Sequence, residues 1–184
     1  MQPSKLFLIG LPGSGKTTLG EAVAARTGCV FVDLDREIER RVGQTVSEIF
    51  ASQGEEAFRR IERETLATVA ATATERPLLI ACGGGTPCSP GNMELMNAAG
   101  LTVRLRASHQ TLLRRLLLEQ SKRPLVAALD PKGISAYITR TARCRNRFYR
   151  LAGATFRSDL LETEQQVDRT ARRFIRQFLS RCTD

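Results

Sequence analysis

Short apolar runs alternate with longer amphipathic stretches along this chain. Such runs are typical of buried strands, and we expect strands at 6–9, 30–32, 78–81, 101–105 and 154–156. Apolar residues recur with helical spacing between them, so we expect helices at 18–26, 36–41, 46–52, 55–73, 93–98, 108–120, 134–150 and from Thr163 onward. Strands alternating with helices predict an α/β fold of three layers, in which helices flank a central, mostly parallel sheet.

The sequence GLPGSGKT at residues 10–17 lies between the first expected strand and the first expected helix. It matches the phosphate-loop pattern G-x-x-x-x-G-K-[ST] in the strand–loop–helix context that this pattern requires, which predicts a P-loop NTPase fold. The residues expected to bind ATP are Gly13, Ser14, Gly15, Lys16, Thr17 and Thr18. Backbone N–H groups and the helix N-terminus would hold the phosphates. Lys16 would add positive charge there, and the Thr17 hydroxyl would bind Mg²⁺.

Length and cysteine content limit the class of protein. At 184 residues the chain is expected to form one domain, residues 1–184. The five cysteines include no C-x-x-C pair, which indicates reduced thiols and not a metal site or disulfides. The N-terminal apolar run is too short for a signal peptide, and no apolar stretch is long enough to span a bilayer. We therefore expect a cytoplasmic protein without a membrane partner.

The net charge of +9 is unevenly distributed. Residues 1–100 hold 10 Lys and Arg against 12 Asp and Glu, whereas residues 101–184 hold 18 against 7. A basic half can bind nucleic acid, form a cationic pocket for a small polyanion, or be a solvated face. The chain has no Trp, 5% aromatic residues, and no helix-turn-helix, RNA-recognition or zinc signature. We therefore expect a small-molecule substrate, no nucleic acid, and a monomer.

Three polar segments follow expected strands: the phosphate loop, Asp33 with Asp35, and a triple glycine at 83–85. Ligands bind at the carboxyl ends of parallel strands, so these segments should converge. Asp33 and Asp35 are two residues apart, which on a strand would place both on one face. We expect Asp33 to help hold Mg²⁺ and Asp35 to orient or deprotonate the substrate hydroxyl. Either aspartate could instead cap the helix that follows.

The motifs of this chain resemble those of shikimate kinases, which are P-loop enzymes similar to the nucleoside-monophosphate kinases. They are the phosphate loop, FVDLD, GEEAFRRIE, GGG, RPL and a late R-x-x-x-Y, in that order over nearly the whole chain. The specific part is D-x-D, G-E-x-x-F-R-x-x-E and G-G-G at these separations. The resemblance implies ATP- and Mg²⁺-dependent phosphorylation of the 3-hydroxyl of shikimate in aromatic amino-acid biosynthesis, and the same division of roles between Asp33 and Asp35.

The expected substrate-binding residues surround these motifs. Arg59 offers a planar fork that matches a carboxylate, and the resemblance implies that it binds the carboxylate of shikimate, supported by Glu62. The three glycines Gly83, Gly84 and Gly85 would lie beside the substrate ring. Arg145 lies four residues before Tyr149 and is expected to bind substrate. Arg147 stands where the family tends to carry Pro, and it remains the alternative to Arg145.

The stretch at 121–133 contains Pro and Gly and interrupts the helical pattern, so we interpret residues 116–133 as a mobile lid. Arg123 in this lid would stabilise the transferring charge, while residues 34–61 would form the substrate-binding region. The resemblance implies that Arg114 or Arg115 stacks on adenine, and the spacing does not decide between them. The alternative functions are a kinase for gluconate or a nucleoside monophosphate, and a non-catalytic nucleotide switch or nucleic-acid-binding module.

Overall fold

The central sheet has five strands, all of them parallel, in the order β2-β3-β1-β4-β5. The computed structural model describes residues 4–122 and 125–179. The strands are β1 (Lys5–Ile9), β2 (Val30–Asp33), β3 (Leu78–Ala81), β4 (Leu101–Arg106) and β5 (Ala154–Arg157). Each expected strand is present within one or two residues, because each apolar run is buried between helices and must pair its backbone groups inside the molecule.

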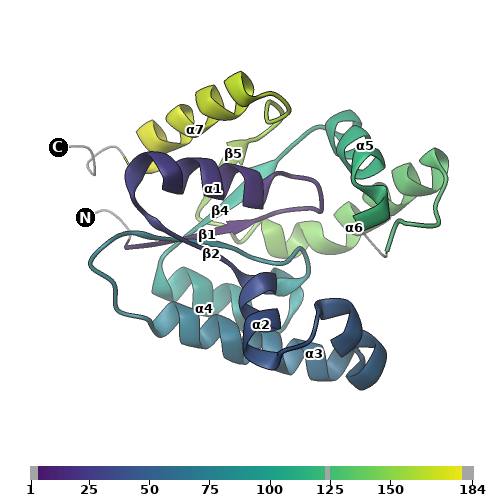
Figure 1. Cartoon of the computed structure of the whole chain (residues 1–184), viewed down its shortest axis with the longest axis horizontal. Coiled ribbons are helices and arrows are strands. Elements are labelled where there is room, and N and C mark those ends of the chain that lie inside the picture. Colours follow the sequence, from purple (N-terminus) through teal and green to yellow (C-terminus); the bar gives the residue numbers. More distant parts are fainter. Residues whose placement is uncertain (1–3, 123–124, 180–184) are drawn as a thin grey trace.

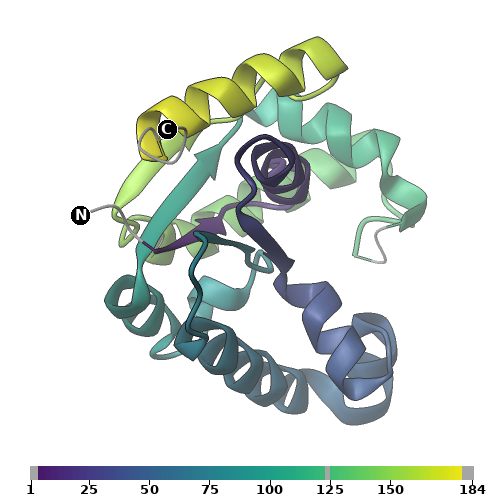
Figure 2. The same ribbon diagram turned by 60° about the vertical axis from the view of Figure 1, so that its left-hand side comes forward.

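Helices cover both faces of the sheet. They are α1 (Lys16–Thr27), α2 (Leu34–Val42), α3 (Val46–Ala71), α4 (Asn92–Ala99), α5 (His109–Leu118), α6 (Pro131–Tyr149) and α7 (Glu164–Phe178), with short 3₁₀ helices η1 (Thr86–Cys88) and η2 (Gln120–Lys122). Figure 1 shows α1 and α7 on one side of the strands and α3 and α4 on the other. Figure 2 shows the same arrangement from a second direction. The predicted three-layer α/β fold is confirmed.

Successive side chains of β1 point to opposite faces of the sheet. Leu6 and Leu8 pack into a core cluster with residues of α1 and α7. Phe7 and Ile9 point to the opposite face and pack with residues of α2, α3 and α4. All four side chains are fully buried, which is why this strand reads as a continuous apolar run and not as an alternation of apolar and polar residues.

Helices α3 and α7 show two features of local geometry. Residues 46–71 are continuous in α3, but Gly54 inside it has φ 81° and ψ 176°, which is not helical, so the break expected between 46–52 and 55–73 is confirmed as a kink. At α7 the Thr163 hydroxyl accepts a hydrogen bond from the Gln166 backbone N–H. The Gln166 side chain accepts from the backbone N–H of Glu162 at 3.1 Å, so this reciprocal contact reaches the residue before Thr163 and not Thr163 itself, as it would in a capping box.

The predicted lid packs against α5 and α6. Val126 is 2% exposed and lies in a separate core cluster with Leu112, Leu116, Ile134 and Ile138. The Gln120 side-chain amide donates to the carbonyls of three residues in this segment. The segment is therefore anchored to α5 and α6 by an apolar contact at Val126. Arg123, the arginine expected to act from the lid, lies outside the described residues.

Part of the positive charge of the second half lies on one exposed face of α6 and its C-cap. The residues are Lys132, Arg140, Arg143, Arg147 and Arg150. Spacings of eight, three, four and three residues place them along one side of the helix, opposite the buried Ile134, Ile138 and Tyr149. Among the interpretations of the basic half, the solvated face describes these five residues best.

Among residues 4–122 and 125–179, no helix combines the length and the apolar character that a membrane span needs.

Candidate active site

A cavity of about 840 Å³ lies at the carboxyl edge of the sheet, where the phosphate loop, α2, α3, the triple glycine, α5 and α6 meet. The predicted site residues that line it are Gly13, Gly15, Lys16, Thr17, Thr18, Asp33, Asp35, Arg59, Gly83, Gly84, Gly85 and Arg145. Ser14, also predicted to bind ATP, does not line the cavity, because it is only 1% exposed. The convergence expected from strand ends is therefore present for segments that are far apart in the sequence.

The phosphate loop has the backbone that its glycines permit. Gly13 and Gly15 have φ of 77° and 85°, a region that residues with a side chain rarely adopt. Gly15 precedes α1, and no side chain caps this helix, so the helix N-terminus is available to an anionic group. Lys16 Nζ reaches back to the Gly10 and Leu11 carbonyls at 3.1 and 3.2 Å. The ammonium group thus lies over the loop where phosphates would bind.

Two side chains from the second half of the chain brace the phosphate loop from behind. The Ser158 hydroxyl, fully buried after β5, donates to the Ser14 carbonyl at 2.8 Å. Arg115 donates to the Gly13 carbonyl at 3.2 Å and to the carbonyls of Ser158 and Asp159 at 3.0 and 2.7 Å. These contacts tie the loop to α5 and to the end of β5, which pre-organises it at little further entropic cost on binding.

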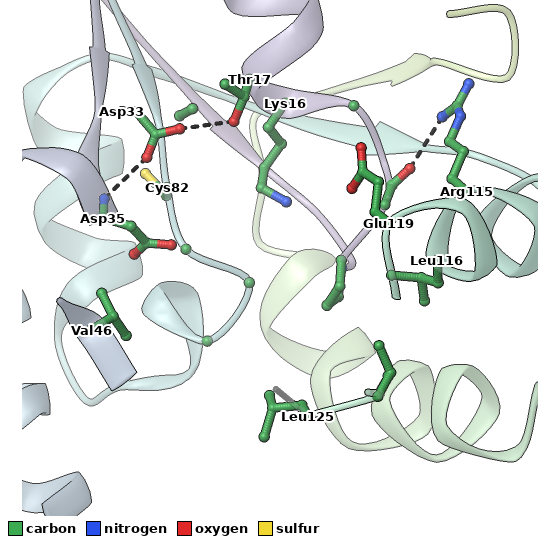
Figure 3. A pocket seen from close by; sticks show the side chains of 18 of the residues that line it. Lys16, Thr17, Asp33, Asp35, Val46, Cys82, Arg115, Leu116, Glu119 and Leu125 are labelled. Carbon is green, nitrogen blue, oxygen red and sulfur yellow. Dashed lines mark hydrogen bonds between the residues drawn. The ribbon is translucent and has the colours of Figure 1, made fainter. Parts of the chain in front are cut away.

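The Asp33 carboxylate accepts hydrogen bonds from three residues. One carboxylate oxygen accepts a hydrogen bond from the Thr17 hydroxyl at 2.8 Å. The other accepts from the backbone N–H groups of Asp35 and Arg36 and caps α2. Figure 3 shows both contacts to Thr17 and Asp35. The capping role left open for Asp33 is therefore present, and it orients the carboxylate toward Thr17 instead of competing with that contact.

Asp35 lies in the first turn of α2, because β2 ends at Asp33. The expectation that both aspartates share one face of a strand is therefore wrong, although both line the cavity. Burial, and after it the nearby carboxylates of Asp33 and Glu62, raise the pKa of Asp35 to about 6, while Lys16 opposes the shift. In the view of Figure 3, Lys16 lies between these aspartates and the residues of α5. A carboxylate with this pKa is suited to accept a proton near neutral pH.

Each residue of the triple glycine faces a different functional side chain. A Cβ atom at Gly83 would lie 2.9 Å from the Asp35 carboxylate, and one at Gly84 would lie 2.9 Å from an Arg145 guanidinium nitrogen. A Cβ atom at Gly85 would lie 2.7 Å from Arg59 Nη2. Real Cβ atoms do not approach so closely, so the three glycines allow these side chains to sit against the loop.

Arg59 has one buried and one exposed partner. Its Nη1 donates to Glu62 Oε2 at 2.9 Å, and Glu62 is 1% exposed. Its Nη2 donates to Glu55 Oε1 at 3.1 Å, but the Glu55 side chain is 69% exposed. The expected contact between Arg59 and Glu62 is thus present, while the exposed contact can be exchanged for a ligand because solvent screens it and competes for it.

The structure separates Arg145 from Arg147. Arg145 lines the cavity, whereas Arg147 is exposed and its guanidinium lies over the Phe148 ring, 4.7 Å from the centroid. Tyr149, one turn after Arg145, is 1% exposed and donates its hydroxyl hydrogen to the Gly84 carbonyl at 2.7 Å. This bond ties α6 to the glycine loop and sets the direction in which Arg145 points.

Arg115 and Arg114 differ in the same way. The Arg115 side chain is 11% exposed and lines the cavity beside Glu162. Arg114 is 54% exposed and pairs with Glu162 from outside. Arg115 is therefore the arginine of this pair that can reach a ligand in the cavity.

Sequence reasoning missed several residues of the site. Thr86, Ser158 and Tyr137 were not singled out, although Thr86 and Ser158 are fully buried and Tyr137 lines the cavity. Thr86 directly follows the triple glycine, and Ser158 directly follows β5, so position at a strand end was the available signal.

Cys82 is buried and packs its sulfur 3.7 Å from that of Met96, whereas Cys88 is only partly buried. Cys82 is therefore a core packing residue, whereas Cys88 is less enclosed.

A phosphate loop after the central strand of a parallel sheet, opening onto a cavity with a buried carboxylate, is the arrangement of a P-loop kinase. Residues 12–178 match the family model described as shikimate kinase. A shikimate kinase of Parabacteroides distasonis is 44% identical over 163 residues, which cover 89% of this chain and 92% of that protein. The chain belongs to the shikimate kinase family.

Solved structures agree with this family. The crystal structure of shikimate kinase from Bacteroides thetaiotaomicron superposes with a TM-score of 0.88 at 37% identity, covering 94% of this chain and 97% of that one. Shikimate kinase from Acinetobacter baumannii in complex with shikimate has a TM-score of 0.81 at 30% identity, covering 100% and 97%. The predictions of a kinase, of ATP as phosphoryl donor and of the shikimate kinase activity are confirmed over the gluconate, nucleoside-monophosphate and switch alternatives.

Proposed function

We propose that the residues of this cavity transfer the γ-phosphoryl group of ATP directly to the 3-hydroxyl of shikimate, with no covalent enzyme intermediate. The observation that carries the proposal is the meeting in one cavity of a phosphate loop, a partly buried aspartate with a raised pKa, and two arginines. Phosphoryl transfer needs little covalent chemistry from the protein, so positioning and charge are the main requirements.

The nucleotide would bind over the phosphate loop. Lys16 would neutralise charge on the β- and γ-phosphates, with support from the N-terminus of α1. The residues present fit Mg²⁺, because the Thr17 hydroxyl and an Asp33 oxygen lie 2.8 Å apart and Mg²⁺ prefers oxygen ligands completed by water and phosphate. When bound there, Mg²⁺ would neutralise charge on the phosphates. Asp33 would contribute through its oxygen that faces Thr17.

The acceptor would bind between α3, the glycine loop and α6. Shikimate carries a carboxylate, and the guanidinium groups of Arg59 and Arg145 lie against the same loop, at Gly85 and Gly84. Two arginines can hold a carboxylate through charge-assisted hydrogen bonds and fix the orientation of the ring. Asp35 faces the same loop at Gly83, where it would accept the proton of the attacking 3-hydroxyl.

Closure of the lid would complete the site during catalysis. Residues 116–133 would close over ATP and exclude water, with Arg123 placed at the transferring oxygens only after closure. Residues 34–61 would belong to the substrate-binding region of a single kinase domain, 1–184. We further propose a monomer in the cytoplasm, with the oligomeric state measurable by light scattering.

A coupled assay of ADP release tests the proposal. ADP release should require ATP, Mg²⁺ and shikimate together, and gluconate or a nucleoside monophosphate should not replace shikimate. Lys16→Ala should abolish turnover while thermal unfolding stays near that of the parent, because the substitution removes charge from the site and no core side chain. ADP release that is independent of shikimate, or a Lys16→Ala variant with near-normal turnover, would contradict the proposal.

A further inference from the structure

Thr86 connects the end of the glycine loop to the interior of α3. It is the first residue of η1 and is fully buried. Its hydroxyl donates to Glu62 Oε1 at 2.6 Å. Its carbonyl accepts a hydrogen bond from the Asn92 side chain at 2.9 Å, and Asn92 is also fully buried. The position of the Thr86 hydroxyl is therefore fixed from both sides, by its backbone and by its side-chain partner.

The two oxygens of Glu62 have different partners. Oε1 accepts from Thr86, and Oε2 accepts from Arg59 Nη1 at 2.9 Å. A buried carboxylate with a strong donor on each oxygen cannot rotate without losing one of them. Because the Thr86 hydroxyl donates to Oε1, Glu62 binds Arg59 through Oε2 alone, and the two residues do not form a bidentate ion pair. The Nη2 side of the Arg59 guanidinium is left to the exposed Glu55, which an incoming carboxylate can displace.

We propose that Thr86 is a positioning residue for the carboxylate of the acceptor, acting through Glu62 on Arg59. The inference rests on the proposed role of Arg59 in binding that carboxylate. The hydroxyl of Thr86 holds Glu62 in the orientation that directs the Nη2 side of Arg59 into the cavity. Without it, Oε1 loses a buried donor, Glu62 turns both oxygens toward Arg59, and the guanidinium is drawn away from the substrate.

The experiment compares Thr86→Val, which keeps the shape and removes the hydroxyl, with Thr86→Ser, which keeps the hydroxyl. The expected result for Thr86→Val is an increase of about 10-fold in KM for shikimate, equivalent to weakening one hydrogen bond between Arg59 and the acceptor carboxylate. KM for ATP and kcat should stay within about twofold of the parent, since a change in ground-state binding alone leaves them in place. Thr86→Ser should restore KM.

Thr170→Val is the matched control. Thr170 is 3% exposed in α7, its hydroxyl donates to the Leu160 carbonyl at 2.6 Å, and neither residue lines the cavity. It should lose comparable thermal stability and leave KM for shikimate unchanged. If Thr86→Val does not fold, Thr86→Ala is measured in its place. An unchanged KM in the folded Thr86 variant, or no recovery in Thr86→Ser, would overturn the inference.

Arg59→Ala separates this inference from the proposed function. If Arg59→Ala leaves KM for shikimate unchanged, the role of Arg59 is wrong and Thr86 has nothing to position. If Arg59→Ala raises KM and Thr86→Val does not, only the role of Thr86 fails. In the double variant, Thr86→Val should add nothing to the effect of Arg59→Ala, because both act on one contact. Additive effects would show that Thr86 acts by another route.

Discussion

Gly85 and Arg59 approach so closely that no side chain fits between them: a Cβ atom at residue 85 would lie 2.7 and 2.8 Å from the two terminal guanidinium nitrogens. The atoms that would have to move are the flexible end of Arg59 and not the backbone. The fold can therefore accept a methyl group here, but the guanidinium cannot keep its place.

Gly85→Ala should accordingly weaken shikimate binding more than it weakens the fold. We expect KM for shikimate to rise about 10-fold or more, through loss of a charge-assisted contact. The free energy of unfolding should fall by less than about 1 kcal/mol, as for a substitution that strains no core residue. Steady-state kinetics and urea denaturation measure the two effects. A large loss of stability with normal KM would contradict this account of Gly85.

Asp35→Asn should reduce kcat by about 10²- to 10⁴-fold, the usual contribution of a general base. Asn keeps the size of the side chain and cannot accept the hydroxyl proton, so KM for ATP should change little. In the parent, kcat/KM should fall as the pH drops below about 6, because protonation of Asp35 removes the base. A variant with full turnover, or a rate independent of pH from 5 to 8, would exclude Asp35 from the proton transfer.

The same substitution should stabilise the unliganded protein at neutral pH. Burial raises the pKa of Asp35 from its ordinary value of about 3.8 to about 6, so the folded state binds its proton more tightly than the unfolded state. The parent therefore loses stability as the pH rises from about 4 through 6, to a total of roughly 3 kcal/mol. The Asp35→Asn variant does not lose this stability, because Asn carries no titrating carboxyl group. Urea denaturation at pH 4 and pH 7.5 should show equal stability at the lower pH and a more stable variant at the higher pH.

Arg145→Ala and Arg147→Ala form a matched pair on one helix. Arg145 lines the cavity and Arg147 is exposed over Phe148. We expect Arg145→Ala to raise KM for shikimate by about 10- to 100-fold, the cost of losing a hydrogen-bonded charge, and Arg147→Ala to leave it within about twofold, as for other surface charges. The reverse order of effects would show that α6 turns when substrate binds.

Arg115→Ala and Arg114→Ala test the brace behind the phosphate loop. Arg115 holds the carbonyls of Gly13, Ser158 and Asp159, so its loss should loosen the loop and raise KM for ATP by about 10-fold, the cost of a buried charge-assisted contact. KM for shikimate should not change. Arg114→Ala should behave like the parent, because its ion pair with Glu162 is half exposed. Equal effects of the two substitutions on KM for ATP would exclude the brace.

Local patterns were sufficient for most of the fold and for the main members of the site. The strands could be found because each is buried on both faces and reads as an apolar run. The phosphate loop could be found because its backbone requires glycine at fixed positions, as at Gly13 and Gly15. The meeting of the phosphate loop, Asp33 and the triple glycine followed from the rule that strand ends of a parallel sheet share an edge, whereas Arg59, which lies in α3, was placed by the family resemblance.

The rest depended on tertiary contacts that no short pattern contains. Arg145 and Arg147 are two residues apart, about 200° around a helix, and only the burial of Tyr149 against Gly84 decides which one faces inward. The boundary between β2 and α2 was missed because Asp33 both ends the strand and caps the helix. Thr86 and Ser158 act through partners 24 and 144 residues away in the sequence, a separation at which spacing carries no signal.

The central place of β1 in the sheet has a consequence for synthesis on the ribosome. β1 pairs with β3 and β4, whose pairing partners begin at Leu78 and Leu101, yet it is the first strand to emerge. At roughly 5–20 residues per second, the interval before β4 follows is on the order of 5–20 s. During that time Leu6, Phe7, Leu8 and Ile9, all fully buried in the finished protein, have no complete sheet to enter. The nascent chain thus carries an unpaired apolar strand, the kind of segment that chaperones shield from aggregation.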